Sequence, residues 1–380
     1  MQNNYKPIGN YIQPIDERNN SLHDLPLVGL SISKEFIPSV ANIIGTDLSN
    51  YKIIKKNQFA CSLMQVSRDG KMPIAMFAED EAMMSPAYPL FEVINDNDLL
   101  PEYLMMWFSR SEFDREAAYY AVGGVRGNLP WEDFLEMKLP VPSISTQRAI
   151  VAEYNALQNR IDNNQKIIQK LEETAQAVYK EWFVDNRDEG WEEITVKDFC
   201  VEMKSGGTPS RTENNYWNSN DIPWVKTGEI KNNIVIQAEE YISNAGLKYS
   251  SAKLLPKDTV LMSMYGVNAG EIGILKFEAT TNQACCGMIC KNAEQSAYLY
   301  YHLLHNQQFI ASQAIGGAQE NLSKDFIEKI EIFKPNNEIL NNPIFKIIID
   351  NKEVLTRENQ KLNELKTLLL SKLAKGGRDL

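Results

Sequence analysis

The sequence has few of the residues that metal sites and nucleophilic catalysis require. Its 380 residues include three histidines and five cysteines, and no two cysteines have CxxC spacing. An odd number of cysteines without that spacing is typical of reduced thiols in a cytosolic protein. Cys285, Cys286 and Cys290 lie close together in the sequence, which leaves a metal cluster as an alternative. Buried small residues in a strand explain them better, so we expect no metal site.

Motifs that bind a nucleotide or a methyl donor are also absent. The chain has no GxxxxGK[ST], no GxGxxG after an expected strand and no [DN]PP[YF]. His302 and His305 have the spacing of helical metal ligands, but no HExxH surrounds them, so a core or solvent-facing pair is expected. A weak likeness to the carboxylate–lysine triplet of nucleases occurs at Asp133, Glu136 and Lys138. These residues fall inside the repeated element, so a structural role is expected. We therefore expect no catalytic residue in this chain.

The sequence contains neither a long apolar run nor a strong positive charge. No segment is apolar enough to span a membrane, and residues 1–10 lack a signal-peptide core, so a cytoplasmic location is expected. The formal net charge is −11. Such an acidic chain is not expected to hold a long stretch of DNA alone. Any nucleic-acid surface must be local, or partner subunits must supply part of it.

A long heptad pattern occupies the middle of the chain, in Gln147–Asp185. Apolar residues recur there in alternating steps of four and three, with the polar Asn164 at one seam position, and neither Gly nor Pro interrupts them. This pattern is typical of a long helix that packs on another helix. Val151, Tyr179 and Phe183 widen the apolar face, which predicts a docking stripe for a further subunit.

The chain also contains an internal duplication. Gly123–Pro142 (GGVRGNLPWEDFLEMKLPVP) aligns without gaps to Gly316–Pro335 (GGAQENLSKDFIEKIEIFKP), and Leu99–Phe108 matches Gln295–Leu304 in character. A second heptad seam in Ile344–Lys375 matches the first at an offset of about 194 residues. Each copy is therefore a globular segment followed by a long helix.

The duplication predicts an α+β fold with two similar mixed domains joined by a two-helix antiparallel coiled coil. We expect globular parts at residues 1–145 and 188–340 and spacer helices at 146–187 and 341–380. Short β-branched runs in Lys52–Val66, Lys257–Val267 and Gly270–Phe277 are typical of strands. Single amphipathic helices are expected over 101–120 and 295–314.

Several segments resemble the specificity subunit of type I restriction-modification systems (the HsdS family). They are the GGTPSR…YW…IPWVKTGEI run that begins at Gly206, the twice-used NL…P element and the central helix. The resemblance implies that each globular copy is a target recognition domain that reads one half of a bipartite site in double-stranded DNA. It implies that the helices set the gap and dock two methyltransferase subunits, which restriction motor-nuclease subunits join. S-adenosylmethionine, ATP and magnesium would then belong to those partners and not to this chain.

Loop residues that can contact phosphates or bases are the candidate DNA-binding residues. An ordinary exposed hairpin, or a glycine pair needed for positive φ, is the alternative explanation for some of them. Trp217 and Trp224 are expected to pack and fix their loops. The candidates are Arg68, Lys71, Arg126, Lys204, Arg211, Tyr216, Lys226, Tyr265 and Gln319.

The heptad pattern also predicts the residues of the spacer core. Asn164 and Glu358 occupy matching positions, and we expect them to form one polar layer that fixes the register. A protein-binding adaptor without sequence-specific DNA reading and an enzyme with a cleft in one globular copy remain alternatives. The predicted spacer core is Ile150, Tyr154, Leu157, Ile161, Asn164, Ile168, Leu171, Ile348, Leu355, Glu358, Leu362, Leu365 and Leu369.

Overall fold

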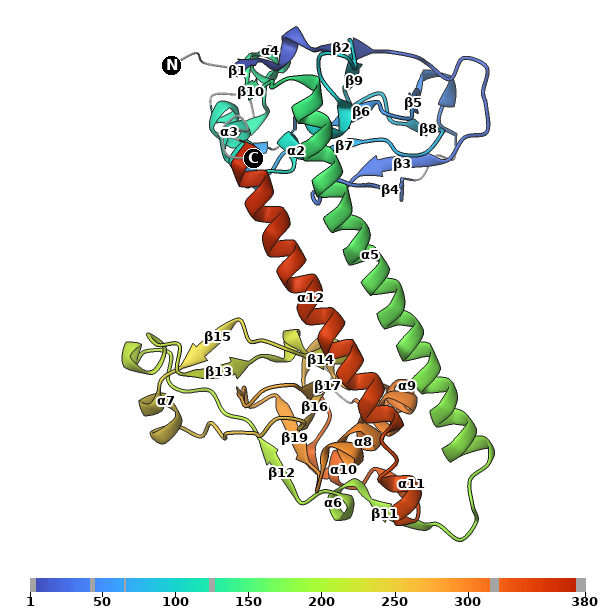
Figure 1. Ribbon diagram of the computed structural model, residues 1–380, viewed down its shortest axis with the longest axis vertical. Helices are drawn as coiled ribbons and strands as arrows, with labels where there is room; N and C mark the ends of the chain where they lie inside the picture. The colour runs from blue at the N-terminus through green and yellow to red at the C-terminus, as the bar shows by residue number, and fades with distance from the viewer. Residues whose placement is uncertain (1–4, 42–44, 65, 123–126, 315–320, 374–380) are drawn as a thin grey trace. The chain divides into compact units, whose positions relative to one another are not determined.

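The protein is a mixed α+β chain that divides into two compact units. The computed structural model describes residues 5–41, 45–64, 66–122, 127–314 and 321–373. Unit 1 comprises Met1–Arg160 and Lys361–Leu380, and unit 2 comprises Ile161–Gln360. Figure 1 shows two long helices, α5 (Ile144–Lys180) and α12 (Ile344–Leu373), and each contributes residues to both units. In the described part of the chain, no helix is long and apolar enough to cross a membrane.

The described residues of the globular part of unit 1 form three sheets, ordered β1-β10, β2-β9-β6-β7 and β4-β3-β8-β5. Helices α2 and α3 cover a core in which Phe59 and Phe91 stack at 5.1 Å between ring centroids and Phe108 meets both rings edge-on. The elements are β1 (Tyr5–Pro7), η1 (Ile8–Asn10), β2 (Ile12–Ile15), β3 (Leu27–Leu30), β4 (Phe36–Pro38), η2 (Leu48–Asn50), β5 (Lys52–Lys55), β6 (Phe59–Cys61), α1 (Val66–Asp69), β7 (Ile74–Met76), β8 (Glu81–Met84), β9 (Leu90–Val93), α2 (Pro101–Phe108), α3 (Ser111–Ala121), α4 (Trp131–Glu136) and β10 (Lys138–Pro140).

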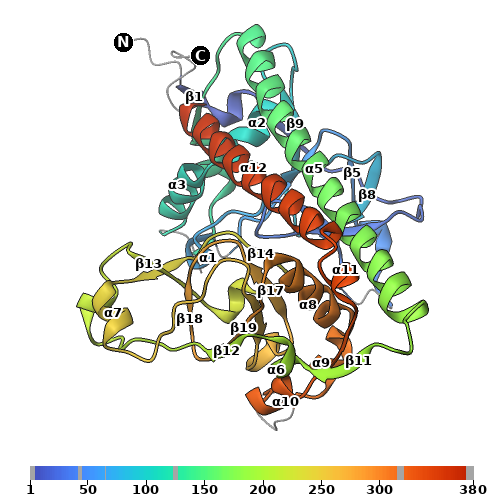
Figure 2. The same ribbon diagram turned by 60° about the horizontal axis from the view of Figure 1, so that its bottom comes forward.

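In unit 2, the part of the globular segment that the structure describes also forms three sheets, ordered β11-β20, β12-β19-β16-β17-β14 and β15-β13-β18. Within this unit α8 lies beside the first turns of α12, where the rings of Tyr301 and Phe345 are 5.1 Å apart (Figure 2). After α5 continues as a π-helical turn (Glu181–Asp185), the elements are β11 (Glu192–Thr195), α6 (Val196–Phe199), β12 (Glu202–Ser205), η5 (Asn214–Tyr216), β13 (Ile222–Val225), η6 (Thr227–Glu229), β14 (Asn233–Val235), β15 (Glu240–Ile242), α7 (Asn244–Lys248), β16 (Val260–Ser263), η7 (Gly266–Asn268), β17 (Ile272–Leu275), β18 (Thr280–Thr281), β19 (Cys285–Ile289), α8 (Ala293–His305), α9 (Gln307–Ser312), α10 (Lys324–Glu328), β20 (Glu331–Lys334) and α11 (Asn337–Leu340).

Equivalent hydrogen bonds in the two units support the duplication. The hydroxyl of buried Tyr103 on α2 donates to the carbonyl oxygen of Pro140, at 3.1 Å. The hydroxyl of Tyr298 on α8 donates to the carbonyl oxygen of Phe333, at 2.6 Å. In each copy, a tyrosine of the first long helix of the globular part therefore ties that helix to its last strand. Tyr103 and Tyr298 are 195 residues apart, whereas Leu99–Phe108 and Gln295–Leu304 match at an offset of 196 residues.

The two helices expected over 101–120 and 295–314 are each broken in two, so the prediction of single helices was wrong. Arg110 has extended backbone angles (φ −77°, ψ 140°) between α2 and α3, and the Ser109 hydroxyl donates to the carbonyl of Met105. Between α8 and α9, the Asn306 side chain donates to the carbonyl of His302. In both copies a polar side chain satisfies a carbonyl at the helix end, which makes the break stable.

Helices α5 and α12 run antiparallel within each unit. In unit 2, Asn164 Nδ2 donates to Asn359 Oδ1 at 2.9 Å, and Lys352 Nζ lies 2.5 Å from a Glu172 carboxylate oxygen. In unit 1, Lys366 bonds to Gln158. The residue number on one helix therefore falls as that on the other rises. Lys352 is only 2% exposed, so these polar contacts lie in the seam and not at its edge.

The predicted seam is correct for one heptad position of α12 and wrong for the other. Ile348 and Leu369 are buried, as expected, and Leu355 and Leu362 are half-buried. The second seam position is held by Lys352, Asn359 and Lys366, one residue after the predicted Glu358 and Leu365. Leu365 is 50% exposed, and the partner of Asn164 is Asn359. A search for apolar residues passed over these positions because the seam there is polar.

The remaining predicted seam residues lie on α5. Ile150, Asn164 and Ile168 are buried, and Tyr154, Leu157, Ile161 and Leu171 are half-buried. Tyr179 and Phe183, which were expected to form a docking stripe, are 3% and 5% exposed in the core of unit 2. Val151 is half-buried and packs against the unit 1 core. That stripe prediction was therefore wrong, because each globular part uses these side chains for its own attachment to the helix.

The Asn164–Asn359 contact gives a first testable prediction. Asn164→Leu leaves the half-buried Asn359 amide without this hydrogen bond, so we expect a loss of about 1 kcal/mol in the free energy of unfolding. Because Asn164 Oδ1 is itself buried and unsatisfied, Asn164→Leu with Asn359→Leu should restore or exceed the wild-type stability. Urea unfolding of the wild type, both single variants and the double variant measures this coupling. A double variant as unstable as the sum of the single variants would contradict it.

Candidate nucleic-acid interface

Two of the predicted DNA-binding residues, Arg211 and Lys226, meet in one cluster in unit 2. The Arg211 guanidinium lies 3.5 Å from the centroid of the Trp217 ring and forms an ion pair with Glu240 at 2.5 Å. Lys226 Nζ lies 3.1 Å from the other Glu240 oxygen. The hydrogen bond from Arg211 is the main reason that the pKa of Glu240 is lowered, so this carboxylate is charged at neutral pH.

Local backbone structure places the two tryptophans beneath this cluster. Trp224 lies on β13 directly opposite Glu240 on β15. Its indole N–H donates to the carbonyl of Gly207 at 3.0 Å, and that of Trp217 donates to the carbonyl of Ser210 at 3.0 Å. The two rings meet edge-to-face at 5.0 Å, as expected for residues that fix their loops. Trp224 is 3% exposed, which confirms its packing role.

The cationic side chains of the cluster are already balanced by carboxylates. Lys226 Nζ also lies 2.8 Å from Glu239, whose hydrogen bond is the main cause of the raised pKa of Lys226. Glu229 accepts from the backbone N–H groups of Lys226 and Glu239, at 2.8 and 2.9 Å. Phosphate contact by Lys226 therefore requires exchange of its carboxylate partners. Sequence reasoning missed these acids because they lie 13 to 29 residues from the cations they neutralise.

The other described candidates of unit 2, Lys204, Tyr216 and Tyr265, make different contacts. Lys204, on β12, forms an ion pair with Glu202 at 2.9 Å. Tyr216 is half-buried, and its carbonyl accepts from the Ser243 backbone N–H. Tyr265 is 41% exposed immediately before η7 and forms an isolated bridge with Asn321.

A further exposed residue, Val267, was not predicted. Its side chain is 99% exposed on η7, between Gly266 at φ 76° and Gly270 at φ 84°. Glycines at both ends of the YGVNAG run are the signal that could have identified it, because they indicate a tight, protruding turn. An apolar group held out in this way can contact a thymine methyl group.

In unit 1, Arg68 and Lys71 lie in the connection between the antiparallel strands β6 and β7. This connection contains the short helix α1 and is not the simple hairpin turn that was considered. The Arg68 side chain is 66% exposed and forms an ion pair with the adjacent Asp69, and Lys71 is exposed. The Arg68 side chain is more exposed than that of Arg211, which is 52% exposed. Arg126 and Gln319 lie outside the described residues.

The described residues contain no group of three or more His, Cys, Asp or Glu side chains that could hold a metal ion. Cys285 and Cys286 are buried in strand β19, as expected, and burial raises the pKa of the Cys286 thiol to about 12. His302 is also buried. Its Nε2 donates to the carbonyl of Glu331 at 2.9 Å, and its Nδ1 accepts from the Tyr179 hydroxyl at 2.8 Å. The imidazole therefore has a structural role.

Comparisons with known proteins agree with this two-copy arrangement. The model of a type I restriction modification DNA specificity domain matches the chain twice, over residues 13–173 and 188–367. The chain belongs to this family. Among its relatives, the type I restriction enzyme HindI specificity subunit of Haemophilus influenzae is 23% identical, over 78% of this chain and 81% of the relative. The MjaIX specificity subunit of Methanocaldococcus jannaschii is 22% identical, over 87% and 84%.

A solved structure of an S subunit shares the fold. The crystal structure of a type I restriction-modification S subunit from M. genitalium matches with a TM-score of 0.62 at 14% identity. The match covers 98% of this chain and 95% of that one. The chain thus has the architecture of a type I DNA specificity subunit, with one family domain in each half.

The buried His302 gives a prediction for pH dependence. Burial lowers its pKa from 6.5 to about 4, so the folded protein holds the neutral form while the unfolded chain takes up a proton below about pH 6.5. This contribution to stability is complete above pH 6.5 and is lost as the pH falls towards 4. Between pH 7 and pH 5 it should reduce the free energy of unfolding by about 2 kcal/mol.

The measurement is urea unfolding of the whole protein at pH 7 and at pH 5. His302→Gln should remove this part of the pH dependence, whereas His305→Gln, at an exposed position of the same helix, should retain it. An unchanged pH dependence in His302→Gln would contradict the assignment.

Proposed function

We propose that each globular part reads one half of a bipartite DNA site and that the α5–α12 pair sets the gap between the halves. One observation carries this proposal: two of the seam contacts are related by the same offset as the sequence repeat. Adding 194 to Glu172 gives Lys366, and adding 194 to Gln158 gives Lys352. The Lys352–Glu172 and Lys366–Gln158 contacts are therefore equivalents of each other under the duplication. Two similar domains on such a helix pair suit two half-sites, and their different sequences suit two different half-sites.

The exposed faces of the two helices suit partner subunits. Several large apolar side chains on them are between 46% and 64% exposed. A partner that covered these side chains would remove apolar surface from water. We propose that two methyltransferase subunits dock there, one on each copy, and that restriction motor-nuclease subunits join that assembly. S-adenosylmethionine, ATP and Mg²⁺ would be bound by those partners, which would supply the chemistry. The exposed residues are Ile167, Val184, Ile347, Val354, Leu365 and Leu368.

A methylation-pattern experiment tests this function against its alternatives. The chain is combined with methyltransferase subunits and random duplexes, and the methylated sequences are determined. We expect a motif made of a half-site, a fixed gap and a second half-site. One continuous motif would contradict the proposal, an absence of sequence selectivity would favour an adaptor, and turnover by the isolated chain would favour an enzyme. Replacing residues 1–142 with another such domain should change one half-site only.

The length of the helix pair gives a further prediction. Because α5 and α12 pair along the seam, one heptad must be inserted in both, after Ile161 and after Lys361. Seven residues add about 10.5 Å of helix, so the gap should lengthen by about three base pairs while both half-sites keep their bases.

The same methylation assay measures the gap. A heptad inserted in α5 alone is the control, because it displaces the Glu172 and Gln158 contacts relative to each other and should prevent normal pairing. If a paired insertion changed the bases recognised and left the gap unchanged, the helices would not set the gap between the half-sites.

The candidate cations of the two units should differ in their effect on the salt dependence of DNA binding. If Arg68 and Lys71 each neutralise a phosphate, Arg68→Ala and Lys71→Ala should each weaken binding equally for all sequences. Each should also reduce the slope of log affinity against log salt by about one. Arg211→Ala should instead alter selectivity at one half-site, because Arg211 fixes the Trp217 loop.

Binding of the complex is measured by gel shift at several salt concentrations. Lys170→Ala, at an exposed ion pair on α5, is the matched control and should leave the slope unchanged. Equal slopes for Arg68→Ala, Lys71→Ala and the control would remove both residues from the interface.

A further inference from the structure

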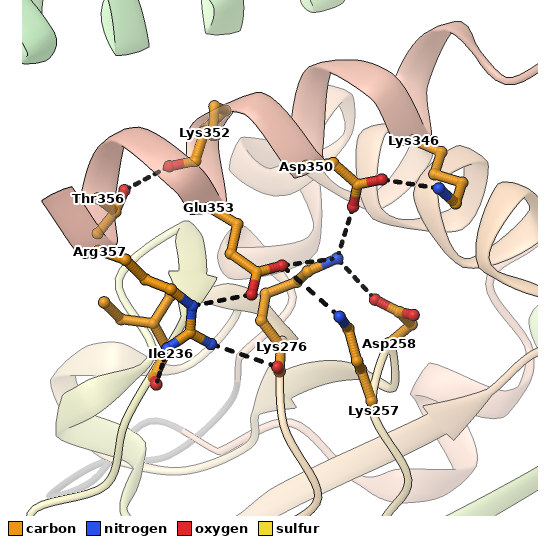
Figure 3. Close-up of polar contacts among 10 residues, drawn as sticks. All are labelled: Ile236, Lys257, Asp258, Lys276, Lys346, Asp350, Lys352, Glu353, Thr356 and Arg357. Carbon is orange, nitrogen blue, oxygen red and sulfur yellow. Dashed lines mark hydrogen bonds and ion pairs between the residues drawn. The ribbon is translucent and has the colours of Figure 1, made fainter.

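A buried lysine connects the globular part of unit 2 to helix α12. Lys276 follows strand β17, and its side chain is 2% exposed. Its Nζ lies 2.8 Å from Asp258, 3.0 Å from Asp350 and 3.4 Å from Glu353 (Figure 3). Asp258 belongs to the globular part, whereas Asp350 and Glu353 lie on α12. One ammonium group therefore joins carboxylates from both sides of the domain–helix boundary.

A second cation joins the same two parts from the opposite direction. Arg357, on α12, donates from Nε to Glu353 at 2.9 Å. Its two terminal nitrogens reach the backbone carbonyls of Ile236 and Lys276, at 3.4 and 3.5 Å (Figure 3). The planar guanidinium has its donors in a fixed fork, so these contacts restrain direction as well as distance. The Gln360 side chain adds a hydrogen bond to Gln237 at 2.6 Å, one helical turn further along.

The geometry makes this cluster sensitive to the angle between domain and helix. Burial alone would lower the pKa of Lys276, but the hydrogen bonds to Asp258 and Asp350 outweigh it, so the ammonium stays charged. A buried charge is tolerated only while its partners remain in place. Movement of the domain along or around α12 would separate Lys276 from Asp350 and Glu353. Apolar contacts in the same boundary, such as Tyr301 with Phe345, have no comparable directionality.

The first copy has no counterpart of this cluster in its sequence. The residues 194 positions before Asp350, Glu353 and Arg357 are Ala156, Asn159 and Asn163. All three are uncharged, and all three are exposed on α5. The charged contacts are therefore not a general requirement of the repeated fold. They are a specific feature of the second half.

We infer that Lys276 and Arg357 are positioning residues that hold the second recognition domain at one angle on α12 and so restrict the complex to a single gap length. This inference rests on the proposed function, in which the helices set the gap. The second half-site is read by loops of the same globular part, such as those carrying Arg211 and Tyr265. A domain that rocks on α12 would present the same loops, and so read the same bases, at a wider range of distances from the first half-site.

The test uses the full chain with its methyltransferase subunits and a duplex library in which the gap between the two half-sites varies. The wild type should methylate one gap length. Lys276→Met, which keeps the length and removes the charge, should increase methylation at gaps one base pair shorter and longer at least tenfold relative to the preferred gap. Both half-sites should keep their bases.

Two further variants make the result decisive. Arg357→Gln acts at a side chain that is 40% exposed, so it tests the same role should Lys276→Met fail to fold. Lys346→Gln is the matched control. It removes a 2.7 Å ion pair with Asp350 that lies entirely within α12, and it should keep the single gap of the wild type.

The outcomes separate this inference from the proposed function. A bipartite wild-type motif whose single gap persists in both Lys276→Met and Arg357→Gln would overturn the positioning role alone. Loss of base selectivity at the second half-site would also overturn it, because the cluster would then maintain the fold of the domain and not its angle. A continuous wild-type motif would overturn the proposed function, and the positioning role with it.

Discussion

Polar side chains in the seam between α5 and α12 are the constraint on which the two-copy arrangement depends. Lys352 is 2% exposed and makes its ion pair with Glu172 inside a helix–helix contact, where leucine would be the more stabilising residue. An apolar seam tolerates sliding by a heptad or reversal of one helix, because one leucine replaces another. A buried ammonium, by contrast, must meet its carboxylate. Such contacts sacrifice stability and in return allow only one register.

The two globular parts attach to this helix pair by different physics. In unit 1 the contacts are uncharged: Ile150 and Leu369 lie in the same core as α2 and α3, and the buried Gln147 side chain of α5 bonds to the backbone of Asp98 and Leu100. The cation–π contact of Lys366 with Tyr154, at 4.9 Å, continues that apolar surface through the lysine stem. In unit 2 an apolar core around Phe345 is supplemented by the buried charges of Lys276 and its partners. Buried charges at the domain–helix boundary therefore accumulate on one copy, although the fold was built by duplication.

Sequence periodicity was sufficient for the long helices and for the repeat, because both are set by residue type at fixed spacing. It failed where a lysine occupies a seam position. The sequence alone predicts surface positions for Lys352 and Lys366. Only the structure shows that Glu172 and Gln158 lie opposite them. The helix breaks at Arg110 and Asn306 were missed for a similar reason, because neither residue is a strong helix breaker. The roles of Arg211 and Lys226 depend on carboxylates distant in sequence, which no local pattern could supply.

The distribution of charge explains how an acidic chain can serve as a DNA reader. The net charge is −11, and in unit 2 carboxylates already occupy the cations of the candidate interface. Non-specific attraction to phosphate is therefore weak at this surface, which disfavours binding to arbitrary DNA. A site that allows Glu239 and Glu240 to be exchanged for phosphate or base edges is favoured only if its other contacts also fit. Under the proposed function, affinity would then come from the partner subunits, while this chain would contribute shape, spacing and the few contacts that distinguish one sequence from another.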